Sequence, residues 1–288
     1  MGVLAMVLGP TGSGKSSTLF TIINRLNTES VNIVTLEDPV EYNIAGVNQV
    51  QVNEKTGMTF ASGLRSILRQ DPDIVSVGEI RDGETAEIAM RAAVTGHLVL
   101  STLHTGDAVS TLDRLADMGI EPYMLATALK GVISQRLVRR ICPHCREAYT
   151  PDEAELESLG IDPRRTDVQF YRGAGCSECF NVGYRGRIVV AETLVIDRAI
   201  SQAIHQQVPR DQLMAAVRAS GFQPVVEEET QVFERFDLRL ARQMPDHEIL
   251  NEMDALRRGI DLRLVFLDPH HLADGTHLVG GQTRDLCD

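Results

Sequence analysis

The segment that most constrains the fold is a glycine-rich stretch near the start of the chain. Residues 9–16 read Gly-Pro-Thr-Gly-Ser-Gly-Lys-Ser, after an apolar run at 3–8 and before a helix-like stretch at 17–26. A buried strand, a glycine loop and a helix in this order are the context that a phosphate-binding loop (P-loop) requires. Glycines let successive backbone N–H groups turn around phosphate oxygens, and the helix N-terminus adds a favourable dipole. The alternative is a chance glycine-rich turn.

The complete pattern predicts the binding of ATP with Mg²⁺. The Lys15 side chain is expected to reach the β- and γ-phosphates, and the Ser16 hydroxyl is expected to ligate Mg²⁺. The predicted nucleotide-binding residues are Gly9, Pro10, Thr11, Gly12, Ser13, Gly14, Lys15 and Ser16.

Carboxylates follow two further predicted strands. An apolar run at 31–36 ends in the acidic stretch 37–41, and a strand predicted over 73–79 ends in Glu79. Open α/β sheets place ligands at the carboxyl ends of their strands, so we expect these carboxylates beside the P-loop. We expect the strand at 31–36 to lie next to the strand that leads into the P-loop. The acidic stretch is able to hold Mg²⁺ or to orient water, or it is a charged strand cap. Glu79 is the candidate for activating the attacking water.

Histidines flank a fourth apolar strand predicted within 95–105. His97 precedes this strand and His104 follows it, at the edge where the ligand is expected. His104 is therefore better placed to sense the γ-phosphate or to couple its loss to movement of the following segment. A structural hydrogen-bonding role is the alternative for both histidines.

Four cysteines form two Cys-x-x-Cys pairs. Cys142 and Cys145 make the first pair, and Cys176 and Cys179 make the second. Four thiolates at this spacing predict one closed tetrahedral Zn²⁺ site, which is structural because it has no open coordination position. Two redox-active pairs or unliganded cysteines remain alternatives, as does His144 in place of one cysteine. Cys287 has no evident partner and is expected to be a free thiol.

Composition limits the environment and the partners. Twenty-eight basic and 40 acidic residues give a net charge of -12, which argues against nucleic acid as the main partner. The longest apolar runs are far shorter than the roughly 20 residues that cross a bilayer. The first eight residues lack the basic region and cleavage site of a signal peptide. We therefore expect a cytoplasmic, reducing environment.

Taken together, these motifs resemble the type II secretion and type IV pilus-assembly ATPases of the bacterial secretion ATPase superfamily. The resemblance rests on the P-loop, the acidic box at 36–42, the segment 68–82, the histidine box at 95–105 and residues 135–140 leading into the cysteines. It implies a homo-hexameric ring, peripheral at the cytoplasmic face of the inner membrane, that hydrolyses ATP to extrude pilin-like subunits. An inner-membrane platform protein and a cytoplasmic adaptor are the implied partners.

The resemblance also assigns candidate roles. Glu79 matches an atypical Walker B position and Glu41 matches the acidic-box position assigned to catalysis, while His97 and His104 match the histidine box. Three arginines are candidates for neutralising phosphate charge or for contacts between subunits, because guanidinium groups stabilise transferring phosphoryl oxygens: Arg65, Arg69 and Arg81. Solvated surface arginines are the alternative. A tetracysteine element is typical of extension or secretion motors and is missing from retraction motors.

The sequence departs from the family at both ends. Family members carry a domain before the P-loop strand that helps to cover the nucleotide, whereas this sequence starts at Met1, directly before that strand. We therefore expect weak ATPase activity and doubtful ring assembly from the chain alone. Residues 223–288 are an unrecognised charged tail, with helices predicted at 225–244 and 247–256. Its histidines at 270, 271 and 277 are expected in a surface loop and not at a metal.

The predicted fold is α/β, with a RecA-like P-loop NTPase core and a mainly parallel sheet. The predicted domains are the core at 1–140, a small zinc-binding subdomain at 141–182, a helical extension at 183–222 and the tail. The predicted function is an ATPase motor for type II secretion or type IV pilus assembly. The alternatives are a nucleic-acid translocase of a conjugation-type system and a scaffold that binds ATP without turnover.

Overall fold

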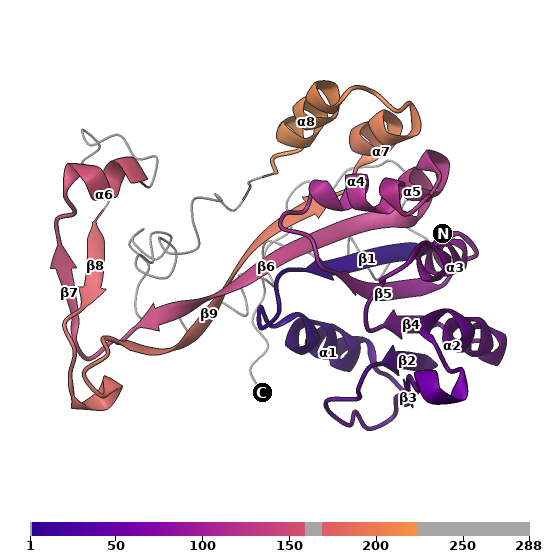
Figure 1. The fold of residues 1–288 in the computed structure, drawn as a ribbon, viewed down its shortest axis with the longest axis horizontal. Helices are drawn as coiled ribbons and strands as arrows, with labels where there is room; N and C mark the ends of the chain where they lie inside the picture. The colour runs from indigo at the N-terminus through magenta and orange to yellow at the C-terminus, as the bar shows by residue number, and fades with distance from the viewer. Residues whose placement is uncertain (1, 159–168, 223, 225–288) are drawn as a thin grey trace, which may run out of the picture.

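The computed structural model describes residues 2–158, 169–222 and 224. A seven-stranded sheet with the order β3-β2-β4-β5-β1-β6-β9 forms the centre of the molecule, and a two-stranded sheet, β7-β8, lies apart from it (Figure 1). The strands are β1 (Val3–Leu8), β2 (Ile33–Glu37), β3 (Asn48–Gln51), β4 (Ile74–Val77), β5 (Leu98–Leu103), β6 (Leu129–Ile141), β7 (Arg146–Tyr149), β8 (Phe170–Gly173) and β9 (Tyr184–Val195).

Helices follow most strands of the large sheet. They are α1 (Lys15–Leu26), α2 (Phe60–Ile67), α3 (Gly83–Val94), α4 (Ser110–Asp117), α5 (Pro122–Ala128), α6 (Glu153–Ser158), α7 (Arg198–His205) and α8 (Arg210–Ala219). Short 3₁₀ helices lie at Glu54–Thr56, Leu68–Gln70 and Ser177–Cys179. Within the described ranges, no helix is both long and apolar enough to cross a bilayer.

The sheet is buried on both faces, as a parallel sheet usually is. In β1, Leu4 and Met6 join the core that packs against α2, α3 and α5, whereas Ala5 and Val7 join a second core against α1. Strands β1 to β6 pair in parallel, and only β9 runs antiparallel to its neighbour β6. The predicted α/β fold with a mainly parallel sheet is therefore confirmed.

The strand order differs from the sequence-based expectation at one point. We expected the strand that leads into the acidic stretch to lie next to the P-loop strand. Instead, β4 and β5 lie between β2 and β1. The order of strands in a sheet depends on how distant segments pack together, which the local sequence does not show.

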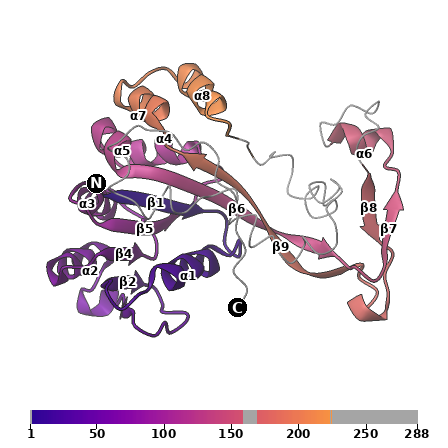
Figure 2. The same ribbon diagram turned by 180° about the vertical axis from the view of Figure 1, so that it is seen from behind.

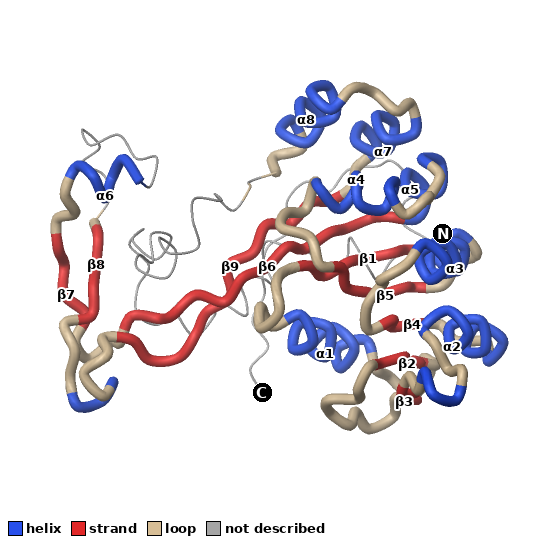
Figure 3. The backbone as a smooth tube through the Cα atoms, viewed as in Figure 1, coloured by secondary structure: helices blue, strands red, loops and turns tan. Residues whose placement is uncertain are grey.

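Strands β6 and β9 form a long ribbon that leaves the core. Paired residues run from Gly131 opposite Val195 to Ile141 opposite Tyr184. The ribbon carries the cysteines and the two-stranded β7-β8 sheet at its far end, away from the other strands of the large sheet (Figures 2 and 3). One pair of strands therefore joins the cysteine region to the β6-β9 edge of the large sheet.

The range 183–222, predicted as a helical extension, begins with a strand. Tyr184–Val195 forms β9, and helices start only at Arg198. The physical reason is local, because Ile188, Val189 and Val190 are β-branched and pair with β6. The tail at 223–288, with its predicted helices, its histidines and Cys287, lies outside the described residues, apart from residue 224.

Candidate functional site

The glycine loop turns sharply between β1 and α1. Gly9, Gly12 and Gly14 have φ angles of 137°, 80° and 88°, a region that side chains other than glycine rarely adopt. At Gly9 a Cβ atom would lie 2.3 Å from the backbone oxygen of Gln135, so no larger residue fits. Gly14 is the N-cap of α1 and has no side chain with which to cap the first turn. The N–H groups of that turn are thus available to an anion.

Lys15 lies folded over its own loop. Its Nζ donates to the carbonyl oxygens of Gly9 at 2.8 Å and of Pro10 at 3.1 Å. Burial lowers the pKa of the Lys15 amine, and the negative charge of Glu79 opposes this shift. The amine is therefore held at the mouth of the loop and within the field of Glu79.

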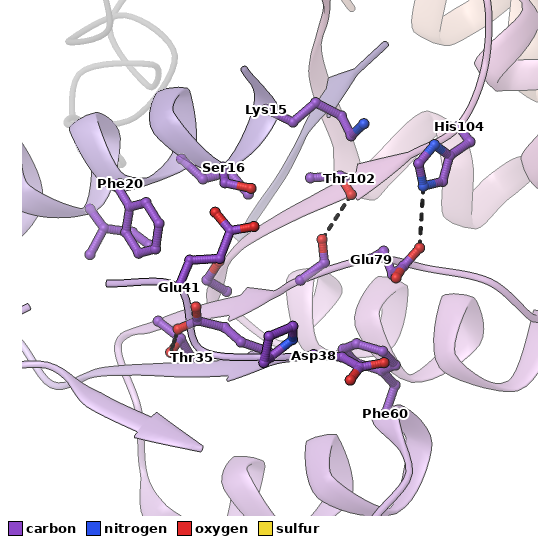
Figure 4. Close-up of a pocket in the computed structure, with 16 residues that line it drawn as sticks. Lys15, Ser16, Phe20, Thr35, Asp38, Glu41, Phe60, Glu79, Thr102 and His104 are labelled. Carbon is purple, nitrogen blue, oxygen red and sulfur yellow. Dashed lines mark hydrogen bonds and ion pairs between the residues drawn. The ribbon is translucent and has the colours of Figure 1, made fainter. Parts of the chain in front are cut away.

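A cavity of about 180 Å³ lies at the carboxyl ends of the strands beside this loop. Figure 4 shows Glu41 pointing toward Ser16, and Glu79 next to His104. The lining residues are Lys15, Ser16, Leu19, Phe20, Ile23, Thr35, Glu37, Asp38, Pro39, Glu41, Phe60, Ser76, Gly78, Glu79, Thr102 and His104. The structure thus brings together the end of the P-loop, the acidic stretch, Glu79 and His104, as the sequence predicted.

Glu79 is held between two nitrogen-bearing side chains. Its Oε1 accepts a hydrogen bond from Arg81 at 2.5 Å, and its Oε2 lies 3.3 Å from His104 Nε2. Burial on its own raises the pKa of Glu79, but the hydrogen bonds and positive charges of Arg81 and His104 outweigh burial and lower the pKa. The carboxylate is therefore kept ionised, the state that a water-activating base requires.

The acidic stretch is divided between fixed and free carboxylates. Glu37 accepts hydrogen bonds from Thr35 at 2.5 Å and from Gln49 at 2.9 Å, which hold it against the sheet. Asp38 lies 3.5 Å from Arg81. Glu41 is exposed and lines the cavity. Of the three carboxylates, Glu41 is the one best placed to reach a bound ion or water.

The remaining arginine and histidine candidates lie elsewhere. Arg65 on α2 forms an ion pair with Glu84 on α3, and Arg69 is exposed in the 3₁₀ turn after α2. His97 precedes β5, so it lies at the opposite end of that strand from His104. Its Nδ1 is 2.9 Å from the backbone oxygen of Ala92. None of these three lines the cavity.

The four cysteines converge at the tip of the ribbon. Their sulfur atoms all lie within 4.8 Å of one another, and three Sγ–Sγ distances are 3.7, 3.8 and 3.9 Å. Four sulfurs bound to one Zn²⁺ at about 2.3 Å would be separated by about 3.8 Å, so the cluster fits a tetrahedral ion. The cysteines are Cys142, Cys145, Cys176 and Cys179.

Backbone groups complete the surroundings of the cysteine cluster. Gly175 N–H donates to Cys145 Sγ at 3.3 Å, and the N–H groups of Cys176 and Gly183 donate to Cys179 Sγ at 3.2 Å. Such donors favour thiolates, which are the form that binds Zn²⁺. Among the described residues, the group of potential metal ligands consists of these four cysteines and does not include His144.

Two buried polar residues near the site were not among the predicted functional residues. Gln135 on β6 is 1% exposed and bonds to the P-loop and α1. Glu192 on β9 is 3% exposed and accepts a hydrogen bond from Ala108 N–H at 2.5 Å, in the loop that follows His104. Gln135 begins the segment 135–140 that contributed to the family resemblance, but nothing in the local sequence assigned a role to it or to Glu192.

Comparison with known proteins identifies one family. The model of the family described as "Type II/IV secretion system protein" matches residues 2–240. Type II secretion system protein E of Pseudomonas aeruginosa is 52% identical over 76% of this chain and 43% of its own length. Type IV pilus assembly ATPase PilB of Thermus thermophilus is 53% identical over 69% of this chain and 22% of its own length. The chain thus spans less than half the length of these relatives.

A solved structure supports the fold. The pilus retraction motor PilT with bound ADP aligns with a TM-score of 0.54 at 32% identity, over 80% of this chain and 61% of that one. This chain belongs to the type II/IV secretion system protein family, the family of the secretion and pilus ATPases.

Proposed function

We propose that this chain is the ATP-hydrolysing core of a motor that drives the assembly or extrusion of pilin-like subunits. The observation that carries the proposal is the convergence of Lys15, Ser16 and an ionised Glu79 on one cavity. Membership of the family supports it, as do relatives named for type II secretion and type IV pilus assembly. The reaction is ATP and water to ADP and phosphate.

Each residue has a proposed role in that reaction. The loop 9–16 cradles the phosphates of the substrate, and the Lys15 amine neutralises their charge. Ser16 and Glu41 would hold Mg²⁺, which when bound offsets charge on the phosphate oxygens. Glu79 orients or activates water, and His104, which contacts Glu79, senses the γ-phosphate or supports catalysis.

The cysteine cluster has a structural role in this proposal. Four thiolates would hold Zn²⁺ at the tip of the ribbon and would leave no position open for water. The ion would supply folding free energy to the β7-β8 region and no chemistry. Because the cluster is typical of extension and secretion motors in the family, we propose that this motor extrudes subunits and does not retract them.

The assembly is proposed from the family. It is a homo-hexamer at the cytoplasmic face of the inner membrane, bound to a membrane platform protein and a cytoplasmic adaptor. Arg65 and Arg69 lie outside the cavity, and this position supports a role between subunits and not at the chain's own nucleotide. Arg81 is proposed to act at the chain's own nucleotide site, because it forms an ion pair with Glu79.

The function is tested by measuring phosphate release from the zinc-loaded chain, with and without DNA. The native mass is recorded on the same sample. We expect Mg²⁺-dependent turnover that is weak in the monomeric chain, is higher in an oligomeric fraction and is not changed by DNA. DNA stimulation that disappears at high salt would instead select a nucleic-acid translocase. Tight ATP binding by the oligomer without phosphate release would select a scaffold.

A further inference from the structure

Gln135 makes two side-chain hydrogen bonds at the base of the P-loop. Its Nε2 donates to the backbone oxygen of Ser13 at 2.7 Å, and its Oε1 accepts from Thr18 Oγ1 at 2.9 Å. One buried carboxamide on β6 therefore joins the loop to the first turns of α1. One of its N–H donors and its carbonyl oxygen are therefore both used.

The first of these bonds fixes the direction of a peptide group. In a trans peptide the carbonyl oxygen and the following N–H point in opposite directions. Since the Ser13 oxygen points at Gln135, the N–H of Gly14 points away from β6. Gly14 has the left-handed φ of 88°, so little in its own conformation resists rotation of this peptide. An external hydrogen bond is thus what holds it.

The second bond and the packing fix the loop against the strand. Thr18 N–H also bonds to the Gly14 oxygen at 3.0 Å, so Thr18 connects Gln135 to the start of the helix. A Cβ at Gly14 would lie 3.3 Å from Gln135 Nε2, which shows how closely the loop rests on this side chain. The P-loop therefore packs against strand β6, and the contacts with Gln135 help to fix its conformation.

We propose that Gln135 is a positioning residue that sets the P-loop for phosphate binding by orienting the Ser13–Gly14 peptide. The inference rests on the proposed function, and it names a residue that acts through the loop without touching the nucleotide. Gln135 aims the Gly14 N–H at the phosphates before they arrive, so the bound state needs less reordering.

A positioning role and a purely stabilising role for Gln135 predict different kinetic effects. Loop N–H groups hold the phosphates in the ground state and in the transition state alike, so weakening them raises KM and the Kd for ATP and changes kcat little. Partial unfolding would instead lower kcat with KM unchanged. Gln135→Leu should raise the Kd for a fluorescent ATP analogue with Mg²⁺ about tenfold, the factor for roughly 1.4 kcal/mol.

A charged variant gives a graded result. Gln135→Glu keeps the acceptor for Thr18 but places a carboxylate against the Ser13 oxygen and near the phosphates. It should therefore weaken binding more than Gln135→Leu does. Nucleotide affinities equal to wild type in both folded variants would overturn the proposal.

Thr18 provides a test that does not depend on the folding of Gln135 variants. Thr18→Val removes the hydroxyl that Gln135 accepts from, and Thr18→Ser restores it. The valine variant should bind ATP several-fold more weakly, and the serine variant should approach wild type. Thr21→Val is the matched control, because Thr21 lies on the exposed side of the same helix and bonds only to Ser17 O among the contacts of the described residues. Equal affinities for Thr18→Val and Thr21→Val would contradict the proposal.

Binding and turnover are read separately, so the two proposals fail separately. If wild type binds ATP but releases no phosphate, the motor function of the isolated chain fails while the affinity series still decides the role of Gln135. If wild type turns over ATP and the Gln135 and Thr18 variants show unchanged KM, the role of Gln135 fails and the motor function stands.

Discussion

Glu79 Oε2 and His104 Nε2 lie 3.3 Å apart at the carboxyl ends of the adjacent strands β4 and β5. Only 18% of the Glu79 side chain is exposed, against 54% for His104. The carboxylate is thus the sheltered member of the pair, and the imidazole is the member open to an approaching phosphate or a neighbouring molecule. In the proposed mechanism, the sheltered carboxylate that activates water is thus in contact with the more exposed imidazole.

Replacement of Glu79 by Gln should leave ATP binding within about twofold of wild type and lower kcat by on the order of 100-fold or more, because the amide cannot accept the proton. Phosphate release and analogue binding measure the two effects. Glu87→Gln on the exposed face of α3 is the matched control. Undiminished turnover in Glu79→Gln would remove this residue from the mechanism.

Arg81→Leu should move the acid limb of the kcat profile to higher pH. Arg81 stabilises the ionised form of Glu79 and so lowers the pKa of that carboxyl, and without the guanidinium the pKa rises. Protonation of the base then begins at a less acidic pH, and kcat falls earlier on acidification. Steady-state turnover over a pH series checks this, and an acid limb at the wild-type position would show that Arg81 does not control the charge of Glu79.

Cys145→Ser should reduce the bound zinc from about one equivalent per chain and lower the Tm, because a structural Zn²⁺ contributes folding free energy. Metal analysis and thermal unfolding measure both. Cys287→Ser is the control and should keep its zinc. Full zinc content in Cys145→Ser would show that this thiol is not a ligand.

Glu192→Leu should lower the free energy of unfolding by about 1–3 kcal/mol, since it leaves the buried N–H of Ala108 without its acceptor. Glu192→Gln keeps an acceptor oxygen and should lose less. Because Ala108 lies in the loop after His104, kcat should fall in the leucine variant as well. Urea unfolding with turnover on the same samples tests this, and a stability equal to wild type would contradict it.

The sequence was sufficient for those parts of the site that a single segment defines. The strand, loop and helix around Lys15 were predictable because glycine spacing and apolar runs are local signals. Glu79 and His104 were expected at the same edge because each follows an apolar strand of a parallel sheet. The cysteine cluster was predictable because the two pairs have the spacing of zinc ligands.

Other parts depend on contacts between distant segments. Gln135 bonds to Ser13 and Thr18, and Glu192 bonds to Ala108, only because β6 lies next to β1 and pairs with β9. No pattern in the local sequence predicts that these strands lie side by side. His97 precedes β5, and the direction of a parallel strand already separates it from the edge of His104. The separation of β2 from β1 by two strands could likewise be known only from the order of strands in the sheet.

The central claim is that the P-loop of this chain supports ATP hydrolysis. The most direct measurement is Mg²⁺-dependent phosphate release by the zinc-loaded wild type and by Lys15→Ala, with Lys55→Ala as a control at an exposed lysine. We predict turnover in wild type and Lys55→Ala and its loss in Lys15→Ala. Equal phosphate release from wild type and Lys15→Ala would contradict the account.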